Sequence, residues 1–244
     1  MGAAATSGVT VVLVHGAWAD GSSWRRVIAI LQARGVAAIA VQNPTTSLAD
    51  DVEATRQILK SVTGPVVLAG HSWGGTVITE AGNEAKVKAL VYVAAFAPDA
   101  GQSTGDQVGA YPAPPGLGGI SDDGTGRLRM SAQSWVENVA QDLPPADARV
   151  LAAIAPPLGP ATFGDAVSRA AWAEKPSWYV VSARDRAVSV DLQRDLAKRM
   201  KARTTELETS HMSLLSAPQA VADVILAAVA AVAAVAAVAA VAAA

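Results

Sequence analysis

Continuous apolar runs recur along the chain between segments with helical periodicity, and this alternation constrains the fold more than any other feature. The runs are residues 9–14, 36–41, 65–69, 89–95 and 177–181. Strands that are buried on both faces have near-continuous apolar sequences, whereas half-exposed strands alternate. The segments with helical patterns are residues 23–33, 48–61, 73–83 and 190–200. The alternation predicts an α/β fold with a mostly parallel, doubly wound sheet and helices on both faces.

Chain length and one irregular segment bound the domain organisation. The 244 residues suffice for one α/β domain with a sizeable core, so we expect a single domain over residues 1–226. Residues 97–176 interrupt the alternation and are dense in Pro, Gly and Asp. Long irregular insertions in compact domains are usually functional. We therefore expect these residues to form a cap over the carboxyl edge of the sheet.

The C-terminal segment has an unusual composition. From Val224 to Ala244 every residue is Ala, Val, Ile or Leu. We expect residues 227–244 to form an Ala/Val-rich extension of the last helix, which begins near Pro218. Such a run is long enough to span a bilayer, but a segment made mostly of alanine gains little free energy on insertion. Membrane contact through this segment is therefore disfavoured.

Charge and cysteine content narrow the classes of partner. The chain has 19 Lys and Arg against 21 Asp and Glu, a formal net charge of −2, and no basic stripe. This balance argues against nucleic acid as a partner and favours a small molecule. The absence of cysteine excludes disulfides and thiolate sites. Residues 1–8 lack the charged and apolar regions of a signal peptide, so we expect a cytoplasmic protein. We also expect it to be a monomer or a homodimer.

The sequence Gly-His-Ser-Trp-Gly-Gly, residues 70–75, lies where an apolar run ends and a helical pattern begins. Glycine on both sides of the serine permits a sharp strand-to-helix turn, because a Cβ atom there would collide with the neighbouring backbone. The turn lifts the Ser72 hydroxyl out of the sheet and places it at a helix N-terminus, where negative charge is stabilised. We predict that Ser72 is the nucleophile of an acyl-transfer reaction.

A serine nucleophile needs a base within hydrogen-bond reach, normally a histidine. The chain has three histidines. His15 ends the first strand, and the turn is expected to point His71 away from the Ser72 hydroxyl. His211 follows a strand-like segment at residues 204–207 and would lie on a loop at the same sheet edge as Ser72. His211 is therefore the predicted base.

The histidine in turn needs a carboxylate that fixes its tautomer. Asp185 follows the apolar run at residues 177–181, and the order Ser, Asp, His along the chain is that of α/β hydrolases. Asp99, which follows the run at residues 89–95, is the competing candidate. We predict Asp185 as the acid.

Acyl transfer also requires donors for the developing oxyanion. We expect them to be the backbone N–H groups of Trp73, which follows the nucleophile, and of Ala17, where Gly16 lets the chain turn toward Ser72. The residues expected to contact substrate are Gly16, Trp18, Trp135 and Met212. Further side chains of the insertion that could line an apolar cavity are Tyr111, Leu128 and Met130.

Four segments carry a resemblance to a known family. They are VVLVHGAW, GHSWGG, SARDRAV and SHMSLLSAPQAVADVI. Through them the chain resembles the α/β-hydrolase superfamily and, within it, small bacterial hydrolases related to the plant methyl-ester esterase and hydroxynitrile lyase group. Lyases of that group carry Thr and Lys at the positions of Gly16 and Met212, so the resemblance implies an esterase. Ser72 in place of Asp disfavours the dehalogenases and epoxide hydrolases of the superfamily.

Together these residues predict a serine hydrolase that cleaves carboxylic esters of small apolar or aromatic substrates through an acyl-enzyme, without metal or cofactor. A lactonase, amidase or perhydrolase would use the same triad and stays an alternative. A noncatalytic ligand-binding protein with the same pocket is the alternative from a different class.

Overall fold

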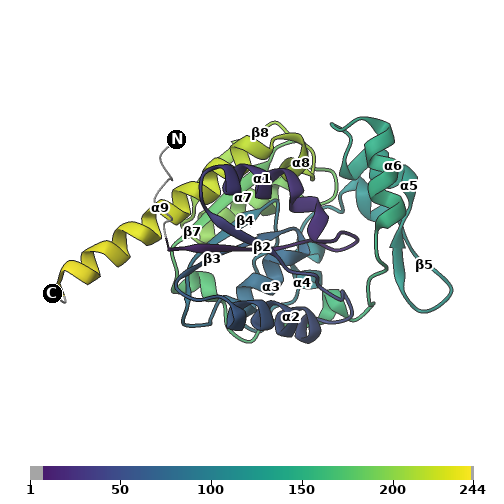
Figure 1. The fold of residues 1–244 in the computed structure, drawn as a ribbon. Coiled ribbons are helices and arrows are strands. Elements are labelled where there is room, and N and C mark those ends of the chain that lie inside the picture. Colours follow the sequence, from purple (N-terminus) through teal and green to yellow (C-terminus); the bar gives the residue numbers. More distant parts are fainter. Residues whose placement is uncertain (1–7, 243–244) are drawn as a thin grey trace.

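A six-stranded parallel sheet forms the centre of the computed structural model, which describes residues 8–242 (Figure 1). The strands follow the order β2-β1-β3-β4-β7-β8, and every neighbouring pair is parallel. The predicted parallel, doubly wound sheet is confirmed. The strands are β1 (Thr10–Val14), β2 (Ala37–Ala40), β3 (Val66–His71), β4 (Val87–Val93), β7 (Ser177–Ser182) and β8 (Arg203–Leu207).

Helices cover both faces of this sheet. Successive residues of a strand point to opposite faces, so Leu13 packs in the same buried cluster as α1 and α9 while its neighbour Val12 packs in the cluster of α2, α3 and α7. This double burial explains the continuous apolar runs. The helices are α1 (Arg25–Ala33), α2 (Leu48–Ser61), α3 (Trp73–Ala81), α7 (Val190–Arg199), α8 (Ser213–Ser216) and α9 (Pro218–Ala242), with the 3-10 turn η1 (Gly21–Trp24) before α1.

Within the insertion between β4 and β7, α5, α6 and β5 form a lobe at the opposite end of the molecule from the tip of α9 (Figure 1), whereas η5 packs against α3. The insertion contains an antiparallel pair, β5 and β6, that the sequence did not predict. Its elements are α4 (Thr104–Gly109), η2 (Pro115–Gly119), β5 (Ile120–Asp122), β6 (Leu128–Met130), α5 (Ala132–Ser134), the π-helical turn η3 (Trp135–Val139), α6 (Pro145–Ile154), η4 (Thr162–Gly164) and η5 (Ala171–Ala173).

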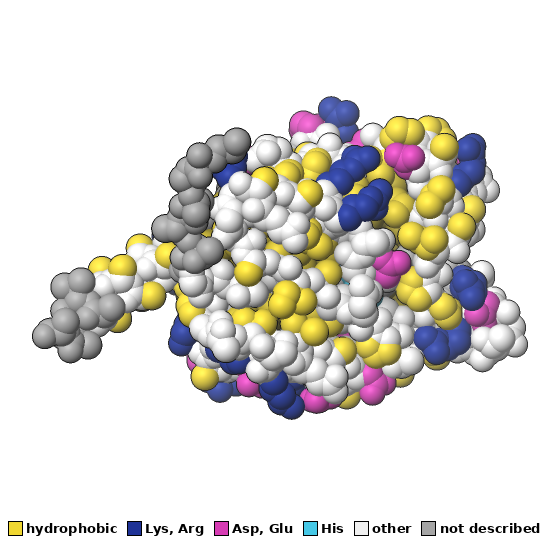
Figure 2. Space-filling model, viewed as in Figure 1, with side chains coloured by type: hydrophobic (Ala, Val, Ile, Leu, Met, Phe, Trp, Pro, Cys, Tyr) yellow, Lys and Arg dark blue, Asp and Glu magenta, His cyan; other side chains and the backbone are white. Residues whose placement is uncertain are grey.

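Helix α9 runs without a break from Pro218 to Ala242. Its first part packs on β3, β4 and β7, and Val229 and Val232 are buried there. The packed part thus extends past the boundary expected at residue 227. Val235 and Val238 are each 71% exposed, and Figure 2 shows the end of the helix protruding from the body. By length and composition alone α9 could cross a membrane.

Two expectations fall partly on residues that are not described. The segment on which the cytoplasmic location rests lies mostly within residues 1–7, and residues 243–244 end the Ala/Val-rich extension. Residues 1–7 and 243–244 lie outside the described residues.

The packing of α9 generates a stability prediction. Deleting residues 228–244 removes the buried Val229 and Val232 and should lower the free energy of unfolding by about 3 to 6 kcal/mol, at about 1.5 to 3 kcal/mol for each buried valine. Deleting only residues 234–244 removes side chains that are exposed wherever their burial is described, and should leave stability nearly unchanged. Urea unfolding followed by circular dichroism measures both. Equal stability of the two truncated proteins would contradict this packing.

Candidate active site

Ser72 occupies a strained backbone position between β3 and α3. Its φ is 53° and its ψ is −123°, in a region that residues with a side chain rarely adopt. Three backbone hydrogen bonds hold it there: the Ser72 N–H donates to the Val93 carbonyl (3.2 Å), and the Ser72 carbonyl accepts from the N–H groups of Gly75 (2.9 Å) and Phe96 (3.2 Å). The strands on one side and the helix on the other therefore fix the direction of this residue.

Two glycines let other backbone segments approach the turn. A Cβ atom on Gly74 would lie 2.5 Å from the Val14 carbonyl oxygen, so only glycine lets α3 start this close to β1. A Cβ atom on Gly16 would lie 2.8 Å from the Ser72 Cβ. Gly16, expected at the substrate site, thus lies directly beside the predicted nucleophile.

His211 and Asp185 are hydrogen-bonded to each other in the loops that follow β8 and β7. The distance from His211 Nδ1 to Asp185 Oδ2 is 2.7 Å, and both side chains are buried. A carboxylate only accepts, so Nδ1 carries the proton and Nε2 is free to act as a base. Asp99, the competing acid, instead forms a half-exposed ion pair with Arg199 (2.7 Å). The structure therefore pairs the histidine with Asp185.

Asp185 is held by three further donors. Its Oδ1 accepts from the N–H groups of Ala187 (2.8 Å) and Val188 (2.9 Å), and its Oδ2 also accepts from the Gln193 amide (2.8 Å). Gln193 is fully buried in α7 and accepts from the Ser182 N–H (3.0 Å), so it links the acid to the end of β7. Gln193 could not be predicted from the sequence, because one glutamine in an amphipathic helix carries no signal of its own.

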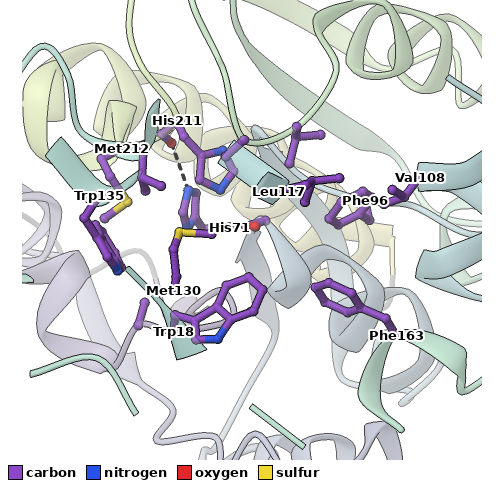
Figure 3. Close-up of a pocket in the computed structure, with 16 residues that line it drawn as sticks. Trp18, His71, Phe96, Val108, Leu117, Met130, Trp135, Phe163, His211 and Met212 are labelled. Carbon is purple, nitrogen blue, oxygen red and sulfur yellow. Dashed lines mark hydrogen bonds between the residues drawn. The ribbon is translucent and has the colours of Figure 1, made fainter. Parts of the chain in front are cut away.

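His71 lies beside His211, and within the described residues it forms no hydrogen bond with the Ser72 hydroxyl. Its Nε2 is 2.9 Å from the His211 carbonyl oxygen, the two imidazole rings are 4.6 Å apart, and both rings line one cavity with Ser72 (Figure 3). Burial of the ring is the main cause, and the electrostatic effect of the nearby His211 the second, that holds the pKa of His71 well below its ordinary value of 6.5. The neutral ring donates its Nε2–H to the carbonyl and so supports the loop that carries His211.

The predicted oxyanion donors lie next to the serine turn. Trp73 is the first residue of α3, so its N–H has no acceptor within the helix. For the Ala17 N–H, the described part of the chain provides no hydrogen-bond acceptor. The preceding loop is fixed by His15, whose Nε2 accepts from the Asn43 N–H (2.9 Å) and whose Nδ1 donates to the Gly16 carbonyl (2.9 Å). Burial lowers the pKa of His15 and keeps it neutral.

An apolar cavity joins these residues to the insertion. The volume of this cavity is about 30 Å³. Figure 3 shows Trp18, Met130 and Trp135 around the histidine pair. Of the residues expected to contact substrate, Trp18, Trp135 and Met212 line it. The other lining residues are Ala17, Ala19, His71, Ser72, Phe96, Val108, Leu117, Met130, Val139, Phe163, Ala187, Val188 and His211.

Two residues expected at the cavity lie elsewhere. The Tyr111 hydroxyl donates to Asp195 (2.7 Å) on the surface of α7. Leu128 pairs with Leu158, and its carbonyl accepts from the Trp18 indole N–H (2.9 Å). Leu128 therefore holds Trp18 in place, and neither side chain lines the cavity.

Comparison with known proteins agrees with this geometry. The model of the alpha/beta hydrolase family matches residues 11–224. The chain belongs to the α/β-hydrolase family. Among curated proteins this α/β hydrolase is 26% identical over 238 residues to a probable hydrolase of Phoma sp. (strain ATCC 20986 / MF5453), covering 88% of this chain and 96% of the relative. It is 34% identical over 109 residues to a carbendazim hydrolyzing esterase of Nocardioides sp. (strain SG-4G), covering 38% and 44%.

Solved structures share the fold of this α/β hydrolase. A pyrethroid hydrolase from Sphingobium faniae JZ-2 matches with a TM-score of 0.77 at 22% identity, over 91% of this chain and 97% of the other. A methylesterase from Arabidopsis matches with a TM-score of 0.74 at 20% identity, over 91% and 99%. The predicted α/β-hydrolase family is confirmed by the family model, and these structures show the same fold.

Asp51 in α2 anchors Trp73 from beneath the site. Its carboxylate is fully buried and accepts from the Trp73 indole N–H (2.7 Å) and from the Thr45 backbone N–H (2.8 Å). Burial raises the pKa of Asp51 from 3.8 to about 6, although both hydrogen bonds act in the opposite direction. Trp73, which follows Ser72, is therefore hydrogen-bonded to a carboxylate whose pKa lies above its usual range.

This pKa shift predicts how stability depends on pH. A carboxyl whose pKa is raised on folding stabilises the fold most when it is protonated, so its contribution falls as the pH rises from about 4 to about 6. A rise of about two units corresponds to about 3 kcal/mol. The Asp51→Asn variant lacks this titration. We expect the difference in free energy of unfolding, wild type minus Asp51→Asn, to fall by up to about 3 kcal/mol between pH 4 and pH 7 in urea unfolding.

The neighbouring Asp50 provides the control, because hydrogen bonds from Thr46 and Ser47 lower its pKa. The difference in free energy of unfolding, wild type minus Asp50→Asn, should therefore decrease as the pH falls toward the pKa of Asp50. This pH dependence is opposite to the one expected for Asp51. Parallel pH profiles for wild type and Asp51→Asn would contradict the burial of a titrating carboxyl.

Proposed function

We propose that this α/β hydrolase cleaves carboxylic esters of small apolar or aromatic substrates, with Ser72, His211 and Asp185 as its catalytic triad. One observation carries the proposal: Ser72 on its strained turn and His211, paired with Asp185, line the same apolar cavity. The names of the relatives, an esterase among them, support ester hydrolysis as the reaction.

The geometry supports a two-step acyl transfer. The Ser72 Oγ attacks the acyl carbon while His211 Nε2 takes the hydroxyl proton, and Asp185 stabilises the imidazolium through the Nδ1–H. The N–H groups of Ala17 and Trp73 stabilise the oxyanion. His211 then gives the proton to the leaving alcohol. In the second step the same histidine activates a water molecule that hydrolyses the acyl-enzyme.

The cavity lining favours neutral, apolar substrates. Apart from Ser72 and the two histidines, every residue that lines it within the described part of the chain is apolar. No Lys or Arg is among these described lining residues, so the site offers no cation for a departing cyanide ion. Both features favour an esterase over a cyanohydrin lyase, as do Gly16 and Met212.

Replacement of the nucleophile tests the proposal. Ser72→Ala should lower the turnover of p-nitrophenyl butyrate by about 10⁴-fold or more, because the acyl-enzyme can no longer form. The melting temperature should change little. An alkyl fluorophosphonate should label Ser72 in the wild type and leave the variant unlabelled.

Ser216→Ala is the control, since Ser216 lies on α8 outside the cavity lining. It should keep both turnover and labelling. Near wild-type turnover by Ser72→Ala, or labelling of a different residue, would refute the assignment of the nucleophile.

A further inference from the structure

Two consecutive residues of the insertion contact the loops that carry the proposed acid and base. The Gln141 amide donates to the Arg184 carbonyl (2.7 Å). The Asp142 carboxylate accepts from the Ser210 N–H (2.7 Å) and from the Ser210 hydroxyl (2.5 Å). Arg184 directly precedes Asp185, and Ser210 directly precedes His211. Residues 141–142 thus form hydrogen bonds with the residue before the proposed acid and with the residue before the proposed base.

The hydrogen bonds of Ser210 orient the backbone on both sides of the histidine. Its hydroxyl donates to Asp142 and accepts from the Met212 N–H (3.2 Å), so the carboxylate acts through Ser210 on the residue after His211 as well. Ser210 is fully buried. Hydrogen bonds to a carboxylate are about twice as strong as neutral ones. The insertion therefore supplies two hydrogen bonds from an exposed carboxylate to the residue before His211.

The two loops are also joined to each other. The Arg184 N–H donates to the Thr209 carbonyl (3.0 Å). Gln141 and Asp142 thus connect the insertion to both the loop that carries Asp185 and the loop that carries His211.

The same segment continues directly from the cavity wall. Trp135 and Val139 of the π-helical turn η3 line the cavity, and only Ala140, itself buried, separates this turn from Gln141. Such π-helical turns are frequent at functional sites. A group bound against Trp135 therefore contacts the element whose next residues hold the histidine loop.

We propose that Gln141 and Asp142 are positioning residues that make the orientation of His211 depend on the placement of the insertion. This inference rests on the proposed function, in which His211 is the base.

The test replaces the carboxylate and measures its effect in two ways. Asp142→Ala should lower kcat for p-nitrophenyl butyrate by about 10- to 100-fold, the effect of a misplaced catalytic group. KM should change less than about threefold, because the interaction is needed for the transition state and not for binding. Asp142→Asn keeps one acceptor oxygen and should restore part of kcat.

The second measurement is independent of activity. Amide hydrogen exchange of residues 209–212, followed by mass spectrometry, should become faster in Asp142→Ala. Asp147→Ala, which removes another carboxylate from the insertion, in the first turn of α6, should change neither readout. If Asp142→Ala does not fold, Ser210→Ala removes the two hydrogen bonds of the hydroxyl, to Asp142 and to the Met212 N–H, keeps the bond from the Ser210 N–H to Asp142, and should lower kcat in the same direction.

Wild-type kcat in Asp142→Ala, or unchanged exchange of residues 209–212, would overturn the positioning role. So would an equal loss of kcat in Asp147→Ala, because the effect would then come from general destabilisation. Absence of ester hydrolysis by the wild-type protein would refute the proposed function instead, and the exchange result would still test the contact between Asp142 and Ser210.

Discussion

The strained backbone of Ser72 is the constraint on which the rest of the site depends. A residue with a side chain at such φ and ψ costs about 1 to 3 kcal/mol, and it persists only when its surroundings hold it. Here β4, the Phe96 segment behind it and the first turn of α3 supply the three hydrogen bonds. The strain is offset by a sheet buried on both faces, so the precision of the site derives from the rigidity of the core.

The position of the turn in the sheet explains why the other groups meet there. The chain passes from β1 outward to β2 and returns to β3 on the other side, so β1 and β3 flank a point where the strand order reverses. Ligands in open α/β sheets bind at the carboxyl ends of strands at such points. Ala17 follows β1 and Ser72 follows β3, which places the proposed oxyanion donors and the nucleophile in one crevice.

Much of the sheet and its helices could be predicted because both depend on local patterns. Helix α2 begins at Leu48 and ends at Ser61 as predicted, since Ser47 caps its N-terminus through the Asp50 N–H. The β5–β6 hairpin was missed because its strands have only three residues each, too few to show a period.

Site residues could be predicted from the sequence where they directly follow parallel strands. Those on other loops could not. Ser72, Asp185 and His211 each follow a strand, and parallel strands bring their carboxyl ends to one edge. The contact of His71 with the His211 loop was not predicted, because the turn motif specifies only the serine. Tyr111 and Leu128 were misplaced because the path of the insertion depends on long-range contacts such as that of Asp142 with Ser210. These contacts involve polar residues in loops, which have no periodic pattern.

The central claim, that Ser72 forms a covalent acyl intermediate within this site, is tested most directly by trapping the intermediate. An aryl N-alkylcarbamate transfers a carbamoyl group that serine hydrolases release slowly. Peptide mass spectrometry after a short reaction should find one carbamoyl group on Ser72, together with one equivalent of released phenol. Release of phenol with Ser72 unmodified, or a carbamoyl group on another residue, would contradict the account.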